Sequence, residues 1–351
     1  MSSETGFHPR PIAEEAATRL LVKAPNWLGD VVMSLPALWA VRSHFPHMHL
    51  GVLVREELAS FFSATPWVDA VIAYRRGKGR FDFSSRWRLI RQVRAQRWNI
   101  GLILPRSFES ALWFYLARVP IRIGVTAQAR SALLTHALHV DLKRPDRHLT
   151  SSYLELVASS LGCPAPSSPP PLSVPATFTT FQVPSPYVIL APGAAYGPAK
   201  QWPAPHWQAL ARKFLALGVQ VALVGTNSER PLCQEVAAGL GPRCHVLAGE
   251  TTLPQLMALL VHSLAYVGND SGATHLAAAL GVPTVALFGS TNPVRTAPHG
   301  ARCTVLYDPP VCSPCLQRTC RFGHYECLHR ITPERVLTAL EQITELPPAL
   351  R

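Results

Sequence analysis

The segment from Tyr266 to Gly289 combines residue types suited to phosphate chemistry. It reads as the end of a strand, a sharp loop, a helix, a turn and a second strand. Asp270, Ser271 and Gly272 stand where the first strand hands over to the helix. The start of a helix presents unpaired N–H groups and partial positive charge, so phosphates bind there readily. We therefore predict an anion-binding helix start at Asp270–Gly272.

A second glycine-containing loop, Pro192–Pro203, follows the first strand expected in the second half of the chain. Gly193 and Gly197 free the backbone to wrap an anion. Lys200 offers a fixed positive charge to phosphate oxygens. The alternative is an ordinary surface lysine, which the coincidence with the helix start at Asp270 makes less favoured.

An acidic residue follows the first strand of the chain in the segment Pro25–Asp30. Gly29 permits a tight turn, and Asp30 projects from the start of the next helix. A carboxylate there can accept a proton from a hydroxyl group. The alternative is that Asp30 only caps the helix, as aspartate commonly does.

Strand-like and helix-like segments alternate in both halves, which predicts α/β domains with parallel sheets covered on both faces. Ligands of such sheets bind beyond the carboxyl ends of the strands. Strands are expected at 20–24, 50–54, 70–73, 100–104, 187–190 and 219–224, and at the two ends of the segment 266–289. Helices are expected at 30–45, 108–118, 205–217, 253–263, 272–281 and 332–345.

The proline-rich stretch Cys163–Pro175 contains six prolines, which fit neither a helix nor a central strand. We predict a mobile tail at 1–18, one domain at 19–162, a linker at 163–184 and a second domain at 185–345. Two such domains leave a cleft between them. We found no internal repeat in the sequence.

The composition of the chain bears on its partners and on its location in the cell. The 351 residues carry a net charge of +12. Residues 1–184 hold 21 Lys and Arg against 12 Asp and Glu, so +9 of that charge lies in the first half. Such an excess suits an anionic partner, or serves solubility alone. No apolar run reaches the roughly 18–20 residues of a membrane span, and the polar start resembles no signal peptide. We expect a cytoplasmic protein.

A basic run begins at Arg75 and continues to Arg97, with nine cations and one acid. Helical spacing places Leu89, Ile90 and Val93 on one face and the cations Arg88, Arg91 and Arg94 on the other. The run either forms a solvated helix face or attracts lipid phosphates of an anionic membrane surface.

Four of the eight cysteines form a cluster with the spacing C-x₂-C-x₄-C-x₆-C, namely Cys312, Cys315, Cys320 and Cys327. Four thiolates can hold a structural zinc ion, and His324 is an alternative ligand. The other reading is four reduced cysteines that pack a loop. Catalysis should not depend on this cluster.

Several of these segments resemble glycosyltransferase family 9. The motifs are Asn26–Asp30, Pro192–Pro203 with its lysine, Asn269–Leu276, the cysteine cluster and Ser107–Ala111. Together they cover about residues 20–345 in the order of the family. Arg106 and Glu109 depart from what the family's equivalent stretch would lead us to expect.

The resemblance implies a GT-B fold, in which two Rossmann-like domains face each other across a cleft, the acceptor on the first and the nucleotide sugar on the second. It implies an inverting transfer of L-glycero-D-manno-heptose from ADP-heptose to a heptose of the lipopolysaccharide inner core, next to the inner membrane. The family's catalytic aspartate falls on Asp30, its phosphate-binding lysine on Lys200 and its nucleotide-sugar motif on 270–272. His275 lies in that motif, and Gly193, Glu229 and Thr251 are expected near the nucleotide. No metal is required for catalysis, because Lys200 and the helix start can stabilise the leaving diphosphate.

Rival interpretations remain open at this point. Another subtype of heptosyltransferase, I or III, fits the same motifs, and nucleotide-sugar 2-epimerases share the architecture. A zinc-containing nucleic-acid binder is suggested by the charge, but Trp87 and Trp98 are the only aromatic pair near the basic run, so we expect no nucleic-acid partner. The chain contains no three-glycine dinucleotide fingerprint, which argues against a dehydrogenase.

Overall fold

A computed structural model describes residues 18–75, 83–165, 169–179 and 181–344. The chain divides into two compact units. The first comprises Met1–Asn26 and Ser34–Pro170, and the second comprises Trp27–Met33 and Pro171–Arg351. The division falls inside the segment predicted as a linker. The predicted tail at 1–18 lies outside the described residues except for Thr18.

The first unit contains a six-stranded parallel sheet in the order β3-β2-β1-β4-β5-β6. Its strands are β1 (Arg19–Lys23), β2 (His49–Arg55), β3 (Ala70–Tyr74), β4 (Ile100–Ile103), β5 (Ile121–Val125) and β6 (His136–Leu138). Its helices are α1 (Leu28–His44), whose first turn groups with the second unit, α2 (Glu56–Ala59), α3 (Phe83–Ala95), α4 (Phe108–Leu116) and α5 (Leu149–Leu161). Two 3-10 turns complete it, η2 (Ser60–Ala64) and η3 (Ser131–Leu133).

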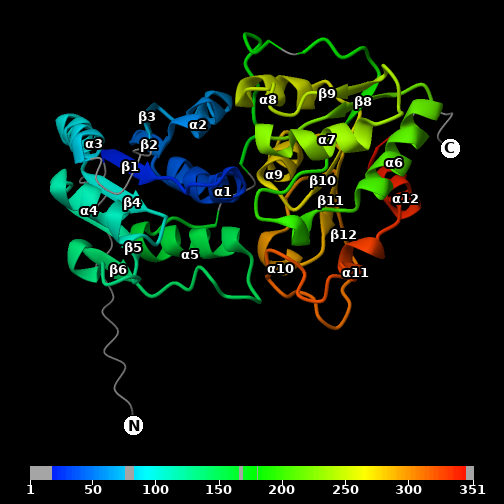
Figure 1. The fold of residues 1–351 in the computed structure, drawn as a ribbon. Coiled ribbons are helices and arrows are strands. Elements are labelled where there is room, and N and C mark those ends of the chain that lie inside the picture. The colour runs from blue at the N-terminus through cyan, green and yellow to red at the C-terminus, as the bar shows by residue number, and fades with distance from the viewer. Residues whose placement is uncertain (1–17, 76–82, 166–168, 180, 345–351) are drawn as a thin grey trace. The chain divides into compact units, whose positions relative to one another are not determined.

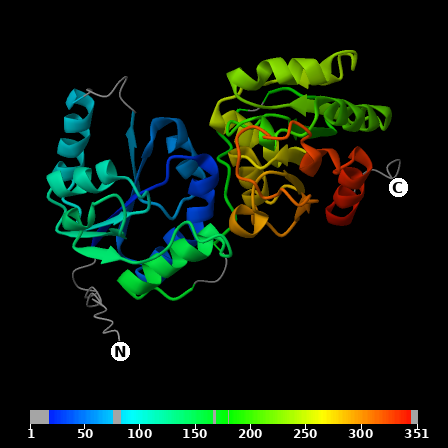
Figure 2. The ribbon, with the colours of Figure 1, turned by 60° about the horizontal axis from the view of Figure 1, so that its bottom comes forward.

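Helices cover both faces of this sheet (Figure 1). The helices α3 and α4 pack on one face, where Ile90, Val93 and Phe114 meet inward-facing strand residues such as Leu21 and Ile103. Figure 2 shows α1 on the other side of the same sheet, with α5 at its edge. Strands buried on both faces are typical of parallel sheets, and all four residues of β4 are buried.

The second unit repeats the strand order without repeating the sequence. Its parallel sheet runs β12-β11-β10-β7-β8-β9. The strands are β7 (Tyr187–Ala191), β8 (Gln220–Leu223), β9 (Cys244–Val246), β10 (Tyr266–Asn269), β11 (Thr284–Phe288) and β12 (Cys303–Tyr307). Counted from its own first strand, each sheet has the order 3-2-1-4-5-6 of a Rossmann fold. The predicted α/β class with two Rossmann-like sheets is confirmed.

The helices of the second unit are α6 (Ala204–Ala216), α7 (Arg230–Ala237), α8 (Leu253–Val261), α9 (Gly272–Ala279), α10 (Pro293–Thr296), α11 (Glu326–His329) and α12 (Pro333–Ile343), with 3-10 turns η4 (Pro198–Lys200) and η5 (Asn227–Glu229). Its main core joins α6, α7, α11 and α12 to the sheet through residues such as Trp207, Phe214 and Leu340, all of which are fully buried. The helices α8 and α9 lie on one side of this sheet, and α6 and α12 lie on the other (Figure 1).

Every strand and helix predicted above occurs in the structure within a few residues of its expected bounds. Thr332 caps α12 by accepting a hydrogen bond from the backbone N–H of Arg335 (3.4 Å). The short strands β5, β6, β9 and β12 were not predicted. Among the described residues, no helix is long and apolar enough to cross a membrane.

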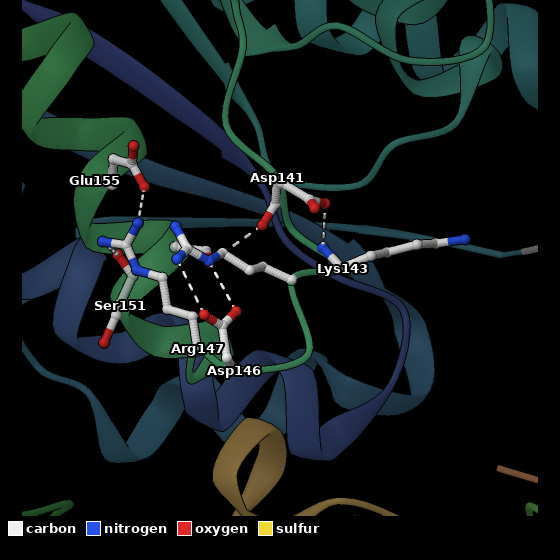
Figure 3. A network of polar contacts seen from close by, with 8 residues as sticks. Asp141, Lys143, Asp146, Arg147, Ser151 and Glu155 are labelled. Atoms are coloured by element: carbon white, nitrogen blue, oxygen red, sulfur yellow. Dashed lines mark hydrogen bonds and ion pairs between the residues drawn. The ribbon is translucent and has the colours of Figure 1, made fainter. Parts of the chain in front are cut away.

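Exposed and half-buried charges hold the loop that leads into α5 (Figure 3). Arg147 pairs with Glu155 and also donates to the carbonyl oxygen of Ser151 (3.3 Å). Arg144 forms a two-point ion pair with Asp146, at 2.8 and 3.0 Å. These contacts order the loop at the surface, where ion pairs contribute little to stability.

Candidate functional site

The carboxylate of Asp270 is the centre of a buried polar cluster. Asp270 follows β10 and is 8% exposed. Its Oδ2 atom accepts hydrogen bonds from Lys200 Nζ (2.5 Å) and from Thr291 Oγ1 (2.7 Å). Lys200 lies on the loop after β7, and β7 and β10 are the neighbouring strands at which the strand order reverses. The structure therefore brings the two predicted anion-binding segments together at the topological switch point.

The buried amide of Asn269 fixes the shape of the loop that carries Lys200. Its Nδ2 donates to the carbonyl oxygen of Pro192 (2.7 Å), and its Oδ1 accepts from the backbone N–H of Trp202 (3.1 Å). One side chain thus ties both ends of the loop to β10. We did not predict roles for Asn269 and Thr291, although Asn269 ends β10 and Thr291 follows β11 at the sheet edge where ligands bind.

The first N–H groups of α9 are not capped by the side chain that precedes them. Ser271 is the N-cap residue, but it makes no side-chain cap hydrogen bond. Its Oγ lies 3.1 Å from Thr274 Oγ1 instead. The start of α9 can therefore donate backbone N–H groups to an anion.

The start of α1 lies against the start of α9. Residues Trp27–Met33, which include the first turn of α1, group with the second unit. A Cβ atom added to Gly272 would lie 3.1 Å from the backbone nitrogen of Gly29. One added to Gly29 would lie 3.0 Å from Cδ2 of His275, which is 4% exposed. Glycine at both positions allows this close approach.

Asp30 lies in that first turn of α1 and is half-buried. Burial raises the pKa of Asp30 to about 6, and the charge of Asp270 acts in the same direction. The cations Arg295 and Lys200 oppose the rise in the pKa of Asp30. Arg295 was not predicted as a member of this site. A carboxylate with this pKa is ionised at neutral pH and is a stronger base than an exposed aspartate.

Glu229 also contacts the loop Pro192–Pro203, which is called the phosphate loop below because it is predicted to bind phosphate. A Cβ atom added to Gly193 would lie 2.2 Å from Cδ of Glu229. The Oε2 atom of Glu229 accepts from the backbone N–H and the hydroxyl of Thr226, at 2.7 and 2.8 Å. Thr251 lies elsewhere, on the loop after β9, directly before the residue that caps α8. The structure thus joins Glu229 to Gly193 and places Thr251 at another strand end of the same sheet edge.

The predicted two-faced character of α3 is confirmed. Leu89, Ile90 and Val93 are buried, while Arg88, Arg91 and Arg94 are exposed. These arginines lie in the first unit and are not part of the cluster around Asp270. The earlier part of the basic run, residues 76–82, lies outside the described residues.

The four clustered cysteines and His324 line one small cavity, beside Ala199 of the phosphate loop. Burial raises the pKa of the Cys327 thiol to about 11, and the other three thiols add to this rise. Desolvation acts to raise the pKa of Cys320, but backbone N–H groups outweigh it and the pKa is lowered overall. Across the described ranges, no three or more His, Cys, Asp or Glu side chains are arranged to hold a metal ion. The zinc site stays a prediction.

Comparisons with known proteins agree with this geometry. The sequence model of the family "Glycosyltransferase family 9 (heptosyltransferase)" matches residues 86–326 of this chain. Lipopolysaccharide heptosyltransferase 2 of Escherichia coli K12 is 30% identical over 93% of this chain and 98% of its own length. The Salmonella typhimurium protein of the same name is 31% identical over the same shares.

A solved structure extends the likeness to three dimensions. The structure of E. coli ADP-heptose lps heptosyltransferase II superposes with a TM-score of 0.79 at 29% identity, over 93% of this chain and 98% of that one. This likeness confirms the predicted GT-B fold class. The chain belongs to glycosyltransferase family 9, the heptosyltransferase family, and is a glycosyltransferase.

Proposed function

We propose that this chain transfers L-glycero-D-manno-heptose from ADP-heptose to the first heptose of the lipopolysaccharide inner core, with inversion at the anomeric carbon. Its relatives in E. coli and S. typhimurium carry the name lipopolysaccharide heptosyltransferase 2 and match nearly their full length. The observation that carries the mechanism is the pairing of Lys200 with Asp270 beside the start of α9, against the helix start that bears Asp30.

Asp30 acts as the general base in this proposal. Its carboxylate takes the proton of the acceptor hydroxyl while the acceptor oxygen forms a bond to the anomeric carbon. The bond from that carbon to the diphosphate oxygen breaks, and ADP leaves with the electron pair. Burial keeps the pKa of Asp30 near 6, so the residue is ionised at neutral pH and still basic enough to accept the proton.

The leaving diphosphate gains negative charge as its bond to the sugar breaks. Lys200 and the uncapped N–H groups at Ser271 and Gly272 supply positive charge for it in a buried setting. Asp270 fixes the position of Lys200. The nucleoside would lie along Gly193, Glu229 and Thr251. No catalytic metal is part of this proposal.

A transfer assay with defined acceptors tests the function. Purified enzyme is incubated with ADP-heptose and core acceptors that carry zero, one or two heptoses, and products are measured by mass spectrometry. We expect a gain of one heptose on the one-heptose acceptor. Transfer only to the acceptor without heptose indicates subtype I, and transfer only to the two-heptose acceptor indicates subtype III. Conversion of the sugar nucleotide without any transfer contradicts the proposal and favours a 2-epimerase.

We also infer a peripheral contact with the anionic face of the inner membrane, where the lipopolysaccharide acceptor would be presented to a cytoplasmic enzyme. The surface of α3 supports it. Arg91, Arg94, Arg97 and Trp87 line one hollow on the surface of the first unit. Phe83 and Trp87, one helical turn apart, are 68% and 54% exposed. Cations near an anionic surface each contribute about 1 kcal/mol, and exposed aromatic rings suit the membrane interface.

Cosedimentation with lipid vesicles tests this contact. We expect binding to vesicles that contain phosphatidylglycerol and little binding to neutral phosphatidylcholine. Replacing Arg88, Arg91 and Arg94 with glutamine should reduce the binding at least tenfold, since about three kcal/mol of attraction is removed. Arg212→Gln on α6 is a matched control. Equal binding of the triple variant and the wild type would contradict the contact.

A further inference from the structure

The ring of Tyr196 lies beside two cations. Tyr196 belongs to the phosphate loop after β7, and its ring is half-buried. Lys200 Nζ lies 4.8 Å from the ring centroid, and the guanidinium carbon of Arg318 lies 5.3 Å from it. The hydroxyl of Tyr196 donates to the carbonyl oxygen of Leu316 (2.6 Å). An arginine from the segment 312–327, called the cysteine segment below, therefore contacts the same ring as the lysine assigned to the diphosphate.

Main-chain contacts hold Arg318 in this place. Its carbonyl oxygen accepts a hydrogen bond from the backbone N–H of Ala199 (3.0 Å), the residue before Lys200. A Cβ atom added to Gly197, whose φ is +146°, would lie 2.5 Å from the same oxygen. The backbone N–H of Leu316 donates to the carbonyl oxygen of Ser290 (2.8 Å). The cysteine segment is thus fastened to the phosphate loop, and the position of Arg318 does not depend on its side chain alone.

The charges around Asp270 leave a need for another cation. Lys200 is paired with Asp270, so this pair as a whole brings no net positive charge to a diphosphate. Arg318 is exposed, and no carboxylate pairs with it within the ranges that the structure describes. Guanidinium groups donate two parallel hydrogen bonds to phosphate oxygens and also stack on aromatic rings.

We propose that Arg318 binds the diphosphate of the sugar-nucleotide donor, as a second cation next to Lys200. Tyr196 aligns the guanidinium, and the Arg318 side chain donates to phosphate oxygens of bound donor and of the departing ADP. The cysteine segment, which lies outside the family's nucleotide motifs named above, then contributes directly to donor binding. This inference rests on the proposed function, because it takes ADP-heptose as the donor.

Calorimetric titration of the full chain with ADP, AMP and adenosine tests the proposal. We expect Arg318→Ala to weaken ADP binding about tenfold or more, as is typical for loss of a charge-assisted hydrogen bond. Adenosine binding should stay unchanged, because adenosine has no phosphate. Arg318→Lys keeps the charge and should recover part of the affinity. Arg321→Ala is the matched control: Arg321 lies three residues away and stacks on Phe322 instead.

The results separate the possible failures. Equal ADP affinity of wild type and Arg318→Ala overturns the role of Arg318 and leaves the proposed function standing if Lys200→Ala still weakens ADP. A parallel loss of ADP and adenosine affinity shows a structural role in the loop and also overturns the proposal, as does an equal loss in Arg321→Ala. A wild type that binds neither ADP nor ADP-heptose defeats the proposed function itself. Thermal melting of each variant checks that the fold is intact.

Discussion

At the switch point of the second sheet, the cation Lys200 faces the carboxylate of Asp270 at 2.5 Å. The corresponding point of the first sheet has a buried cation of another kind. Lys23, the last residue of β1, donates to the carbonyl oxygen of Ala24 (2.5 Å) and to Oδ1 of Asn26 (3.2 Å). Within the described ranges, no carboxylate forms an ion pair with Lys23.

A second buried cation strengthens this difference. Arg130 is fully buried in the first unit and donates to the carbonyl oxygens of Pro105 (2.5 Å) and Ser107 (3.2 Å), on the loop after β4. Burial lowers the pKa of Arg130 to about 10, with Arg106 nearby adding to the effect. Carbonyl oxygens accept hydrogen bonds from both cations, but Nη2 of Arg130 is buried without a hydrogen-bond partner in the part of the chain that the structure describes.

The comparison shows that one strand order can carry two different arrangements of charge. The second switch point keeps a cation positioned by a carboxylate, next to an uncapped helix start, which suits a diphosphate. The first buries Lys23 and Arg130, which have no carboxylate partner within the described ranges, in the unit to which the proposed reaction assigns the acceptor. Topology decides where each site lies, and the loops decide its charge.

The largest effect is expected when the proposed general base, Asp30, is replaced. Asp30→Asn should lower kcat by about 10² to 10⁴, the usual range for a general base, while ADP affinity at the second switch point changes little. Because the pKa of Asp30 is about 6, wild-type kcat/KM should fall about tenfold per unit below pH 6. The variant should lose that dependence. Near-normal turnover, measured by release of ADP, would remove Asp30 from the role of base.

The second largest effect is expected at Lys200. Lys200→Ala removes the cation for the diphosphate and leaves the carboxylate of Asp270 buried without its ion pair. We expect at least tenfold weaker ADP binding in calorimetry. The control is Lys213→Ala, which breaks the more exposed pair between Lys213 and Glu334 (3.1 Å). Unchanged ADP affinity in Lys200→Ala would contradict the phosphate contact.

The sequence predicted the strands and helices around the two switch points better than the side-chain contacts between them. Apolar runs and helix periodicity show where a strand or helix lies, so β7, β10 and α9 were expected. Strands as short as β9 have too few residues for a period to show. The links of Asn269 to Pro192 and Trp202 join positions far apart in the chain. Such contacts depend on which strands are neighbours, and one sequence alone carries no signal for them.

The pairing of charges was equally hidden. Asp270 and Lys200 were both predicted for the site, as separate contributors to phosphate binding. Lys200 and Asp270 neutralise each other because β7 and β10 are neighbours in the sheet, and the sequence does not show this order of strands. Lys23 was passed over because it stands in an apolar run, where a lone lysine shows neither partner nor burial.

A smaller effect is expected from the unpaired lysine of the first switch point. Burial lowers the pKa of Lys23 to about 7, and Arg55 adds to this while Glu109 opposes it. In the unfolded chain the pKa is near 10.5. Between these values the unfolded state binds more protons, so the free energy of unfolding should rise with pH, by at most about 1.4 kcal/mol per unit.

Lys23→Met measures that contribution, because methionine has a similar length and no charge. We expect the variant to show a smaller rise than the wild type in urea denaturation at pH 7, 8 and 9. The same slope in both proteins would mean that Lys23 does not titrate in this range. Lys213→Met is the matched control, since it removes a lysine whose side chain is 40% exposed and should leave the slope as in the wild type.

The smallest effect should come from an ion pair at the protein surface, between Arg144 and Asp146 in the loop of Figure 3. This pair serves as a comparison for the buried charges of both switch points. Asp146 and Arg144 are 63% and 55% exposed. Asp146→Asn should therefore change the free energy of unfolding very little, because water screens an exposed ion pair. The identical change Asp270→Asn should cost several times more, because Lys200 loses its partner where water cannot replace it. Equal costs in urea denaturation would mean that the Asp270 pair is effectively solvated, and that the contrast in charge between the two sheets has no energetic basis.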